Sequence, residues 1–250
     1  MNDSTLVMGI DIGGTGVKTA VVDVTTGQMT TDRLRLATPH PSTPAAVIDT
    51  IKELQAQLRW TGPVGCGFPG LVKSGAVQRA PNLDAAWIGF DLVKELTAQL
   101  GVSKVTIGND ADAAGLAEFR FGAGKNVDGT VVVVTLGTGI GSAIFHDGVL
   151  LPDTEMGHVE LQGKPAEKRA ATSIREKKHL SWKKWGKRLN AYLAHLEYLL
   201  GADLFIIGGG VSKKPEKFFP YLTDVSCKVE AARLGNAAGI VGAALFATRG

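Results

Sequence analysis

The chain has 250 residues, of which 44% are apolar and 20% are charged, and its formal net charge is +3. This length and composition predict a globular protein with a sizeable core, formed by one large domain or two modest ones. The apolar stretch from Leu6 to Ile12 is too short for a signal peptide or a membrane span, so we expect a cytoplasmic protein that does not bind membranes. Cys66 and Cys227 match no metal-ligand spacing, which argues against a disulfide framework or a cysteine-rich zinc site.

The first half of the chain alternates between strand and helix patterns. Three successive apolar runs with turn signals between them predict an antiparallel meander over 6–12, 16–24 and 30–37. Helical spacing after Ser42-Thr43 predicts a helix over 44–60. The remaining expected elements are strands at 64–68, 76–79 and 105–107 and a helix at 91–100.

The second half restates this order. A helix through Phe121 is followed by expected strands at 130–136, 142–146 and 204–207, and an Ala-rich helix covers 239–248. The repetition predicts an α/β protein of two related lobes with a cleft between them. We expect residues 1–110 to form the smaller lobe and 111–238 the larger one, with the C-terminal helix at 239–250 able to complete the first.

Two glycine-rich turns lie between expected strands, one in each half. The first comprises Asp11, Gly13, Gly14 and Thr15, and the second comprises Gly137, Thr138 and Gly139. A turn without Cβ atoms lets backbone N–H groups approach a phosphate, although a single glycine-rich connection is weak evidence. Asp11 is suited to orient Mg²⁺ beside a phosphoryl group. Gly209 and Gly210, after the strand at 204–207, would allow another close backbone approach to the donor.

Asn109 and Asp110 stand where an expected strand ends and a helix begins. Asp110 or Asp112 could simply cap that helix. A carboxylate at the end of a strand facing a cleft could instead accept a proton from a hydroxyl group.

Glu155 and His158 are three residues apart, with a glycine between them, after a loop. A carboxylate and an imidazole can bind sugar hydroxyls in fixed directions. A metal site and a plain surface turn are the alternatives, and zinc lacks a third ligand of suitable spacing.

Six motifs occur in an order that resembles the ROK family of sugar kinases, across nearly the whole chain. They are Asp11-Ile-Gly-Gly-Thr15, Gly67-Phe-Pro-Gly70, Asn109-Asp110, Leu136-Gly-Thr-Gly-Ile-Gly141, Glu155-Met-Gly-His158 and Gly208-Gly-Gly-Val-Ser212. The resemblance implies the two-lobed hexokinase/actin-like (ribonuclease H-like) fold with the sugar and the phosphoryl donor meeting in the cleft, and it makes a homodimer an expectation.

The resemblance also implies residue roles. Asp110 would be the base that takes the proton of a sugar hydroxyl, and the sugar would be held by Asn82, Asn109, Asp110, Glu155 and His158. Many ROK kinases continue with a cysteine-rich zinc-binding stretch and a further sugar-binding Glu. No cysteine occurs in the corresponding stretch here, so zinc is not expected, and Glu167 takes the place of that Glu with Glu160 as its rival.

This zinc-less form resembles the ROK kinases of actinobacteria that phosphorylate glucose at the 6-hydroxyl from inorganic polyphosphate, often from ATP as well. A basic segment favours a polyanionic donor. The residues expected to form a track that binds polyphosphate are Lys164, Lys168, Arg169, Lys177, Lys178, Lys183 and Lys184. A solvated helix face is the plain alternative. Because Trp182 and Trp185 interleave with these cations, nonspecific nucleic-acid binding is another, although no specific nucleic acid is expected. An ATP-only kinase for another sugar and a non-catalytic sugar-responsive protein also stay open.

Overall fold

The computed structural model describes residues 5–81 and 83–248. The chain divides into two compact units: unit 1 is Met1–Ala117 with Ala237–Gly250, and unit 2 is Glu118–Asn236. The division therefore falls inside a helix at Ala117, rather than between residues 110 and 111.

Unit 1 is built on a six-stranded sheet in the order β3-β2-β1-β5-β8, in which β4 also pairs with β2. The strands β1, β2, β3 and β4 pair antiparallel, whereas β1, β5 and β8 run parallel. The strands of this sheet are β1 (Leu6–Gly13), β2 (Gly16–Asp23), β3 (Gln28–Met29), β4 (Leu34–Leu36), β5 (Val64–Phe68) and β8 (Val105–Asn109). A separate hairpin is formed by β6 (Leu71–Lys73) and β7 (Ala76–Arg79).

The expected third strand at 30–37 is wrong in its extent, because the structure breaks it into β3 and β4. The amide of Val21 on β2 donates to the hydroxyl of Thr31 at 3.0 Å instead of to a backbone carbonyl. A side-chain acceptor at this point interrupts the ladder, so pairing resumes only at Leu34.

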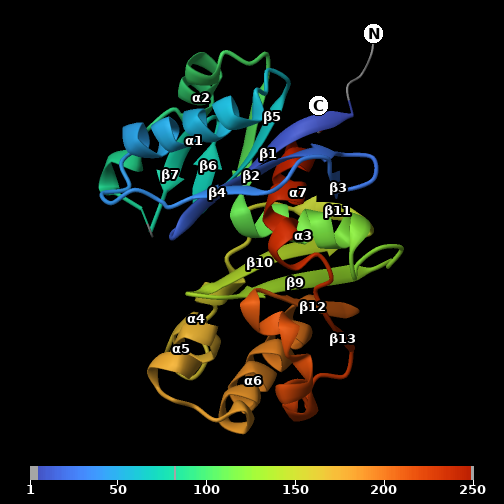
Figure 1. Cartoon of the computed structure of the whole chain (residues 1–250). Helices are drawn as coiled ribbons and strands as arrows, with labels where there is room; N and C mark the ends of the chain where they lie inside the picture. Colours follow the sequence, from blue (N-terminus) through green and yellow to red (C-terminus); the bar gives the residue numbers. More distant parts are fainter. Residues whose placement is uncertain (1–4, 82, 249–250) are drawn as a thin grey trace. The chain divides into compact units, whose positions relative to one another are not determined.

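Two helices, α1 (Pro44–Leu58) and α2 (Leu92–Leu100), cover one face of this sheet (Figure 1). The Thr43 side chain caps α1 by accepting from the amide of Ala46, and Arg59 ends it in the left-handed conformation. Alternation along β1 turns Met8, Ile10 and Ile12 into the core that both helices share.

The other face of the sheet receives α7 (Ala238–Phe246), whose backbone lies against glycines. A Cβ on Gly9 of β1 would overlap the carbonyl oxygen of Ile240, and a Cβ on Gly65 of β5 would overlap that of Ala243. Gly9 and Gly65 are partners in the parallel ladder, so together they form a bare strip across two strands. The backbone of α7 occupies that strip, so this apolar helix from the C-terminal end of the chain is buried in unit 1.

Unit 2 repeats the strand order of unit 1 in its five-stranded sheet, β11-β10-β9-β12-β13. Its first three strands are antiparallel neighbours, and β12 and β13 continue in parallel. The strands are β9 (Thr130–Leu136), β10 (Ile140–His146), β11 (Val149–Leu151), β12 (Leu204–Gly208) and β13 (Lys228–Ala231). The helices are α4 (Glu167–Ala170), α5 (Thr172–Lys177) and α6 (Trp182–Leu200), and α3 (Asp110–Phe121) runs across the division between the units.

The helix α6 packs on the sheet of unit 2 through a buried face (Figure 1). Ser181 caps it by accepting from the amide of Lys184 at 3.2 Å. Trp185, Leu189 and Leu193 lie on the buried face with no exposed area, whereas Lys183 and Lys184 remain exposed. The basic residues at the start of α6 are therefore the solvent side of an amphipathic helix.

Replacing Gly65 by alanine should destabilise the protein, because the added Cβ must push α7 away from β5. Overpacking of this kind costs about 1–3 kcal/mol, and each kcal/mol lowers the melting temperature by about 2–4 °C for a chain of this size. Thermal unfolding followed by circular dichroism measures the shift. Gly14→Ala is the matched control for stability, since a Cβ there has no atom within 4 Å; equal melting temperatures for the two variants would contradict the close packing of α7.

Candidate functional site

The second glycine turn joins β9 to β10 and lies beside the turn that follows β12. Gly208 at the end of β12 is in register with Thr135 of β9. Gly209 has a φ of 85°, and a Cβ on it would overlap the carbonyl oxygen of Leu136. The structure thus brings Gly209 and Gly210 next to the turn of Gly137, Thr138 and Gly139, at the carboxyl ends of two parallel strands. Ligand groups commonly gather at this edge of an α/β sheet.

The segment that carries Glu155 and His158 is anchored to β10, the strand that leaves this turn. The hydroxyl of Ser142 on β10 donates to the carbonyl of Thr154 at 2.8 Å and accepts from the amide of Met156 at 3.0 Å. Gly157 packs so closely that a Cβ would overlap the carbonyl oxygen of Ile140, the first residue of β10.

Glu155 and His158 themselves point to a common place. His158 Nε2 lies 3.9 Å from Glu155 Oε2, and their side chains are 56% and 37% exposed. Glu155 is the N-cap residue of the short helix Met156–His158, and His158 is the last residue of that helix. An accessible carboxylate and imidazole close together can share the hydroxyls of one small polar molecule.

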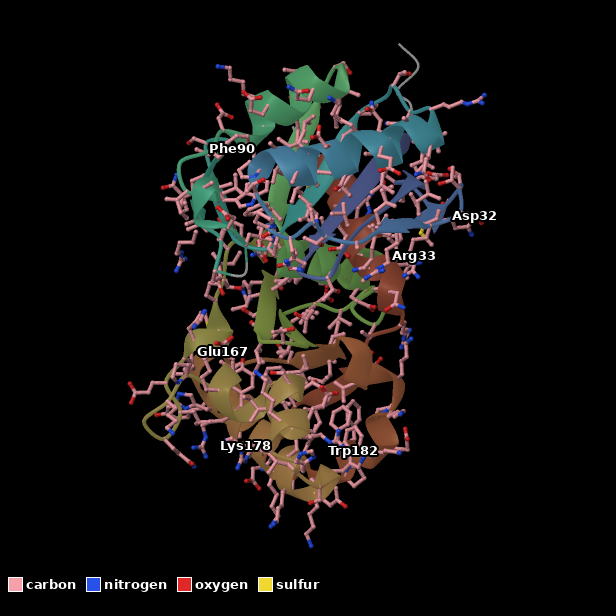
Figure 2. The ribbon with its side chains drawn as sticks, turned by 60° about the vertical axis from the view of Figure 1, so that its left-hand side comes forward. Asp32, Arg33, Phe90, Glu167, Lys178 and Trp182 are labelled. Atoms are coloured by element: carbon pink, nitrogen blue, oxygen red, sulfur yellow. The ribbon has the colours of Figure 1, made fainter. Side chains whose placement is uncertain are left out.

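Glu167 lies against the same glycine turn. Its Oε2 is 2.6 Å from the position that a Cβ on Gly139 would take, and its Oε1 pairs with Lys168 Nζ at 2.8 Å. The Glu167 side chain is only 16% exposed. Glu160, its rival for the sugar site, is exposed and makes an isolated bridge with Pro165. Figure 2 labels Glu167 together with Lys178 and Trp182 of the same unit.

The first glycine turn, between β1 and β2 in unit 1, carries a carboxylate that is already paired. Asp11 Oδ2 lies 2.7 Å from Lys18 Nζ. Sequence reasoning missed Lys18, although the register could have indicated it: the tight turn from Gly13 to Gly16 sets Asp11 directly opposite Lys18. On the other side of the turn, the hydroxyl of Thr38 donates to the carbonyl of Gly13.

The carboxylate of Asp11, in the first glycine turn, is of the kind that Mg²⁺ prefers. Mg²⁺ usually binds through one or two carboxylates together with waters and substrate phosphates. Asp11 keeps one oxygen that Lys18 does not contact, and its side chain is 16% exposed. Among the residues that the structure describes, no group of three His, Cys, Asp or Glu side chains could hold a metal by itself. Asp11 is therefore suited to a Mg²⁺ ion whose remaining ligands are waters and oxygens of the phosphate donor.

Asn109 ends β8, and Asp110 begins α3. Asn109 caps this helix, a role that the plain alternative gave to Asp110 or Asp112: its Oδ1 accepts from the amides of Ala111 at 2.8 Å and Asp112 at 3.2 Å. Asn109 Nδ2 also donates to the carbonyl of Gly70 at 3.2 Å. Asp110 is half-buried in the first turn of the helix. Asn82, the other residue expected to bind sugar in this unit, lies outside the described residues.

The basic segment of unit 2 divides into exposed lysines and side chains held within the structure. Five of the expected tracking residues are exposed and have no ion-pair partner in the described ranges: Lys164, Lys177, Lys178, Lys183 and Lys184. Lys168 pairs with Glu167, and Arg169 is half-buried and donates to Gln162.

The two tryptophans of this segment are not stacking platforms for bases. Trp185 is fully buried, and its Nε1 donates to the carbonyl of Ala170 at 2.9 Å. The guanidinium of Arg175 covers the ring of Trp182 at 3.7 Å, and Phe218 stacks 6.3 Å from it. The aromatic interleaving that suggested nucleic-acid binding therefore belongs to the core of unit 2.

Both cysteines are free and poorly suited to thiolate chemistry. Burial raises the pKa of the Cys66 thiol, and the nearby Asp11 charge raises it further. Burial also raises the pKa of Cys227 to about 12, with the Glu197 carboxylate adding to the effect. Among residues 5–81 and 83–248, no helix combines the length and apolar character needed to cross a membrane.

Comparison with known proteins places these features in a family. The ROK family pattern matches residues 7–174. The chain is 51% identical over 237 residues to a polyphosphate glucokinase of Mycobacterium tuberculosis, covering 95% of this chain and 89% of that protein.

Two solved structures share the fold over almost their whole length. The inorganic polyphosphate/ATP-glucomannokinase of Arthrobacter sp. strain KM is 44% identical, with a TM-score of 0.92 over 98% of this chain and 99% of that one. A ROK family glucokinase from Streptomyces griseus, in complex with glucose and AMPPNP, is 28% identical, with a TM-score of 0.83 over 98% of this chain and all of that one. The expected two-lobed hexokinase/actin-like fold is confirmed, and the chain belongs to the ROK family.

Proposed function

We propose that this protein transfers a phosphoryl group from inorganic polyphosphate, and also from ATP, to the 6-hydroxyl of glucose. The observation that carries the proposal is its similarity, over almost the whole chain, to two proteins whose names specify polyphosphate as donor. Similarity to a glucokinase of Streptomyces coelicolor is lower, at 30%. This difference favours a polyphosphate-using enzyme over an ATP-only kinase.

The described geometry supports the assignment of the donor to the second glycine turn. This turn and the neighbouring Gly209 and Gly210 expose backbone at the ends of two parallel strands. Backbone N–H groups in such a turn can surround a phosphate. The exposed lysines at 177–178 and 183–184 supply the positive charge that a long polyanion requires.

The sugar is assigned to Glu155 and His158, together with Asn109, Asp110, Asn82 and Glu167. Glu155 and His158 are accessible and close together, which supports their role. Asn109 uses its Oδ1 in capping α3, and Glu167 is paired with Lys168, so we expect these two to orient neighbouring groups more than to bear the main contacts with glucose.

Asp110 is the proposed base. The cap provided by Asn109 fixes the first turn of α3. The Asp110 carboxylate accepts the proton of the 6-hydroxyl as that oxygen attacks the terminal phosphorus. The bond from this phosphorus to the bridging oxygen breaks at the same time, and the shortened polyphosphate, or ADP, leaves with that oxygen. Positioning and electrostatic stabilisation supply most of the catalysis in phosphoryl transfer. Mg²⁺, when bound, neutralises charge on the donor oxygens, and Asp11 is the residue that would hold it. A homodimer and a cytoplasmic location stay predictions.

Replacing Asp110 by asparagine should lower kcat by about 10²- to 10⁴-fold, because the amide cannot accept the proton. Glucose binding should change little, since the shape of the side chain is kept. A coupled assay of glucose 6-phosphate and a calorimetric titration with glucose measure the two quantities. Asp32→Asn, which alters an exposed carboxylate in the same unit, is the matched control. Turnover of Asp110→Asn within tenfold of the wild type would remove Asp110 from the role of base.

Replacing Lys177 and Lys178 together by glutamine should raise the KM for polyphosphate by about 2- to 30-fold. This range follows because each exposed ion pair with the donor that is lost costs about 0.2–1 kcal/mol of binding free energy. The KM for ATP should move less than twofold. Because binding of a polyanion releases counterions, the KM for polyphosphate should also rise more steeply with salt than the KM for ATP.

The double variant Lys73→Gln/Lys94→Gln is the control, since it removes the same charge from exposed positions of unit 1. Equal effects of the two double variants on the KM for polyphosphate would show that only net charge matters. The basic segment would then be a solvated surface without a specific part in donor binding.

A further inference from the structure

The second glycine turn is held from one side by a dipeptide that has no assigned role. Three successive carbonyls of the turn accept hydrogen bonds from Thr172 and Ser173 at the start of α5. The Thr172 hydroxyl donates to Leu136 at 3.3 Å, the Ser173 amide to Gly137 at 3.1 Å, and the Ser173 hydroxyl to Thr138 at 2.6 Å. No other segment provides this turn with a comparable set of bonds among residues 5–81 and 83–248.

These bonds decide where the amides of the turn point. In a planar trans peptide, the C=O of one residue and the N–H of the next point in opposite directions. With the carbonyls of Gly137 and Thr138 directed at Ser173, the N–H groups of Thr138 and Gly139 must face the other way.

The two amides so directed are available to a ligand. The amide of Gly137 is occupied, since it donates to the carbonyl of Gly139 at 3.1 Å. No acceptor for the Thr138 or Gly139 amide is found in the described part of the chain. Thr138 is exposed and Gly139 is half-buried. Two adjacent, unoccupied N–H donors that face the same side are suited to a phosphate oxygen.

We propose that Ser173 is a positioning residue for the phosphoryl donor. Its hydroxyl makes the hydrogen bond that orients the peptide between Thr138 and Gly139. Gly139 lacks the Cβ that would otherwise restrict rotation of that peptide. Without the hydroxyl, this peptide can turn its carbonyl toward the donor and present negative charge instead of an N–H group. The inference rests on the proposed function for the identity of the donor. Thr172 supports the same turn through its bond to the carbonyl of Leu136.

The effect on ligand binding should appear in the affinity for the donor and not in the affinity for glucose. Ser173→Ala should weaken binding of tripolyphosphate, and raise the KM for polyphosphate and ATP, by about 3- to 10-fold, the range expected for one hydrogen bond. Both donors should be affected by the same factor because both present a phosphate to this turn. The KM for glucose should stay unchanged. Ser173→Thr, which keeps the hydroxyl, should restore donor affinity to within twofold.

The experiment is a calorimetric titration of the full-length protein with tripolyphosphate, accompanied by donor and glucose kinetics and by thermal unfolding. Ser226→Ala is the matched control: the Ser226 hydroxyl donates to Glu197 at 2.7 Å in the same unit, and it makes no bond to the turn. Weaker tripolyphosphate binding by Ser173→Ala, with normal binding by Ser226→Ala and Ser173→Thr, would establish the inference.

Two results would overturn it: tripolyphosphate binding by Ser173→Ala within twofold of the wild type, or equal losses in Ser173→Ala and Ser226→Ala. The titration does not depend on glucose phosphorylation. If the wild type forms no glucose 6-phosphate, the proposed function fails, while the titration still decides whether Ser173 orients an anion-binding turn.

Discussion

The close approach of α7 to the sheet of unit 1 is the constraint on which the positions of Asp11 and of the start of α3 depend. Gly9 and Gly65 leave no side chain between the strands and the carbonyls of Ile240 and Ala243, so the helix backbone rests on the sheet itself. The same helix brings Gly239 against the carboxylate of Asp11, and a Cβ on Gly242 would overlap the carbonyl of Ala113 in α3. A single apolar helix therefore sets both Asp11 and the helix that begins with Asp110. A side chain on Gly9 or Gly65 would displace α7, and with it both Asp11 and α3.

The two glycine turns are built in the same way within their separate units. In each, a side-chain hydroxyl donates to a carbonyl of the turn: Thr38 to Gly13 in unit 1, and Ser173 to Thr138 in unit 2. A carbonyl engaged in this manner directs the following N–H to the opposite side, because the peptide is planar. Glycine is required for the tight approach, but glycine alone does not select the direction of the amides. The hydroxyl supplies that selection, and a turn prepared in advance loses less entropy when an anion binds.

Sequence reasoning predicted the elements whose patterns are local. The meander of β1 and β2, the helix α1 with its Thr43 cap, and the hairpin of the second glycine turn all follow from short-range spacing. It failed where a distant residue decides. The ladder break at Thr31 depends on a side-chain bond to Val21, and Trp185 is buried because α6 packs on a sheet whose strands both precede and follow it in the chain. The bonds from Ser173 to the glycine turn join residues about 35 positions apart, and no local pattern indicates them. Lys18 is different, since the hairpin register already sets it opposite Asp11.

We propose that this chain phosphorylates glucose from inorganic polyphosphate without a nucleotide. The most direct test is ³¹P nuclear magnetic resonance of the purified full-length protein, freed of nucleotide, incubated with Mg²⁺, glucose and polyphosphate. We expect a growing glucose 6-phosphate resonance and a matching loss of polyphosphate, at a rate that depends on enzyme concentration. The resonance should not appear when glucose is omitted. Formation of glucose 6-phosphate only after ATP is added would contradict it, and would identify the protein as a nucleotide-dependent sugar kinase of the ROK family.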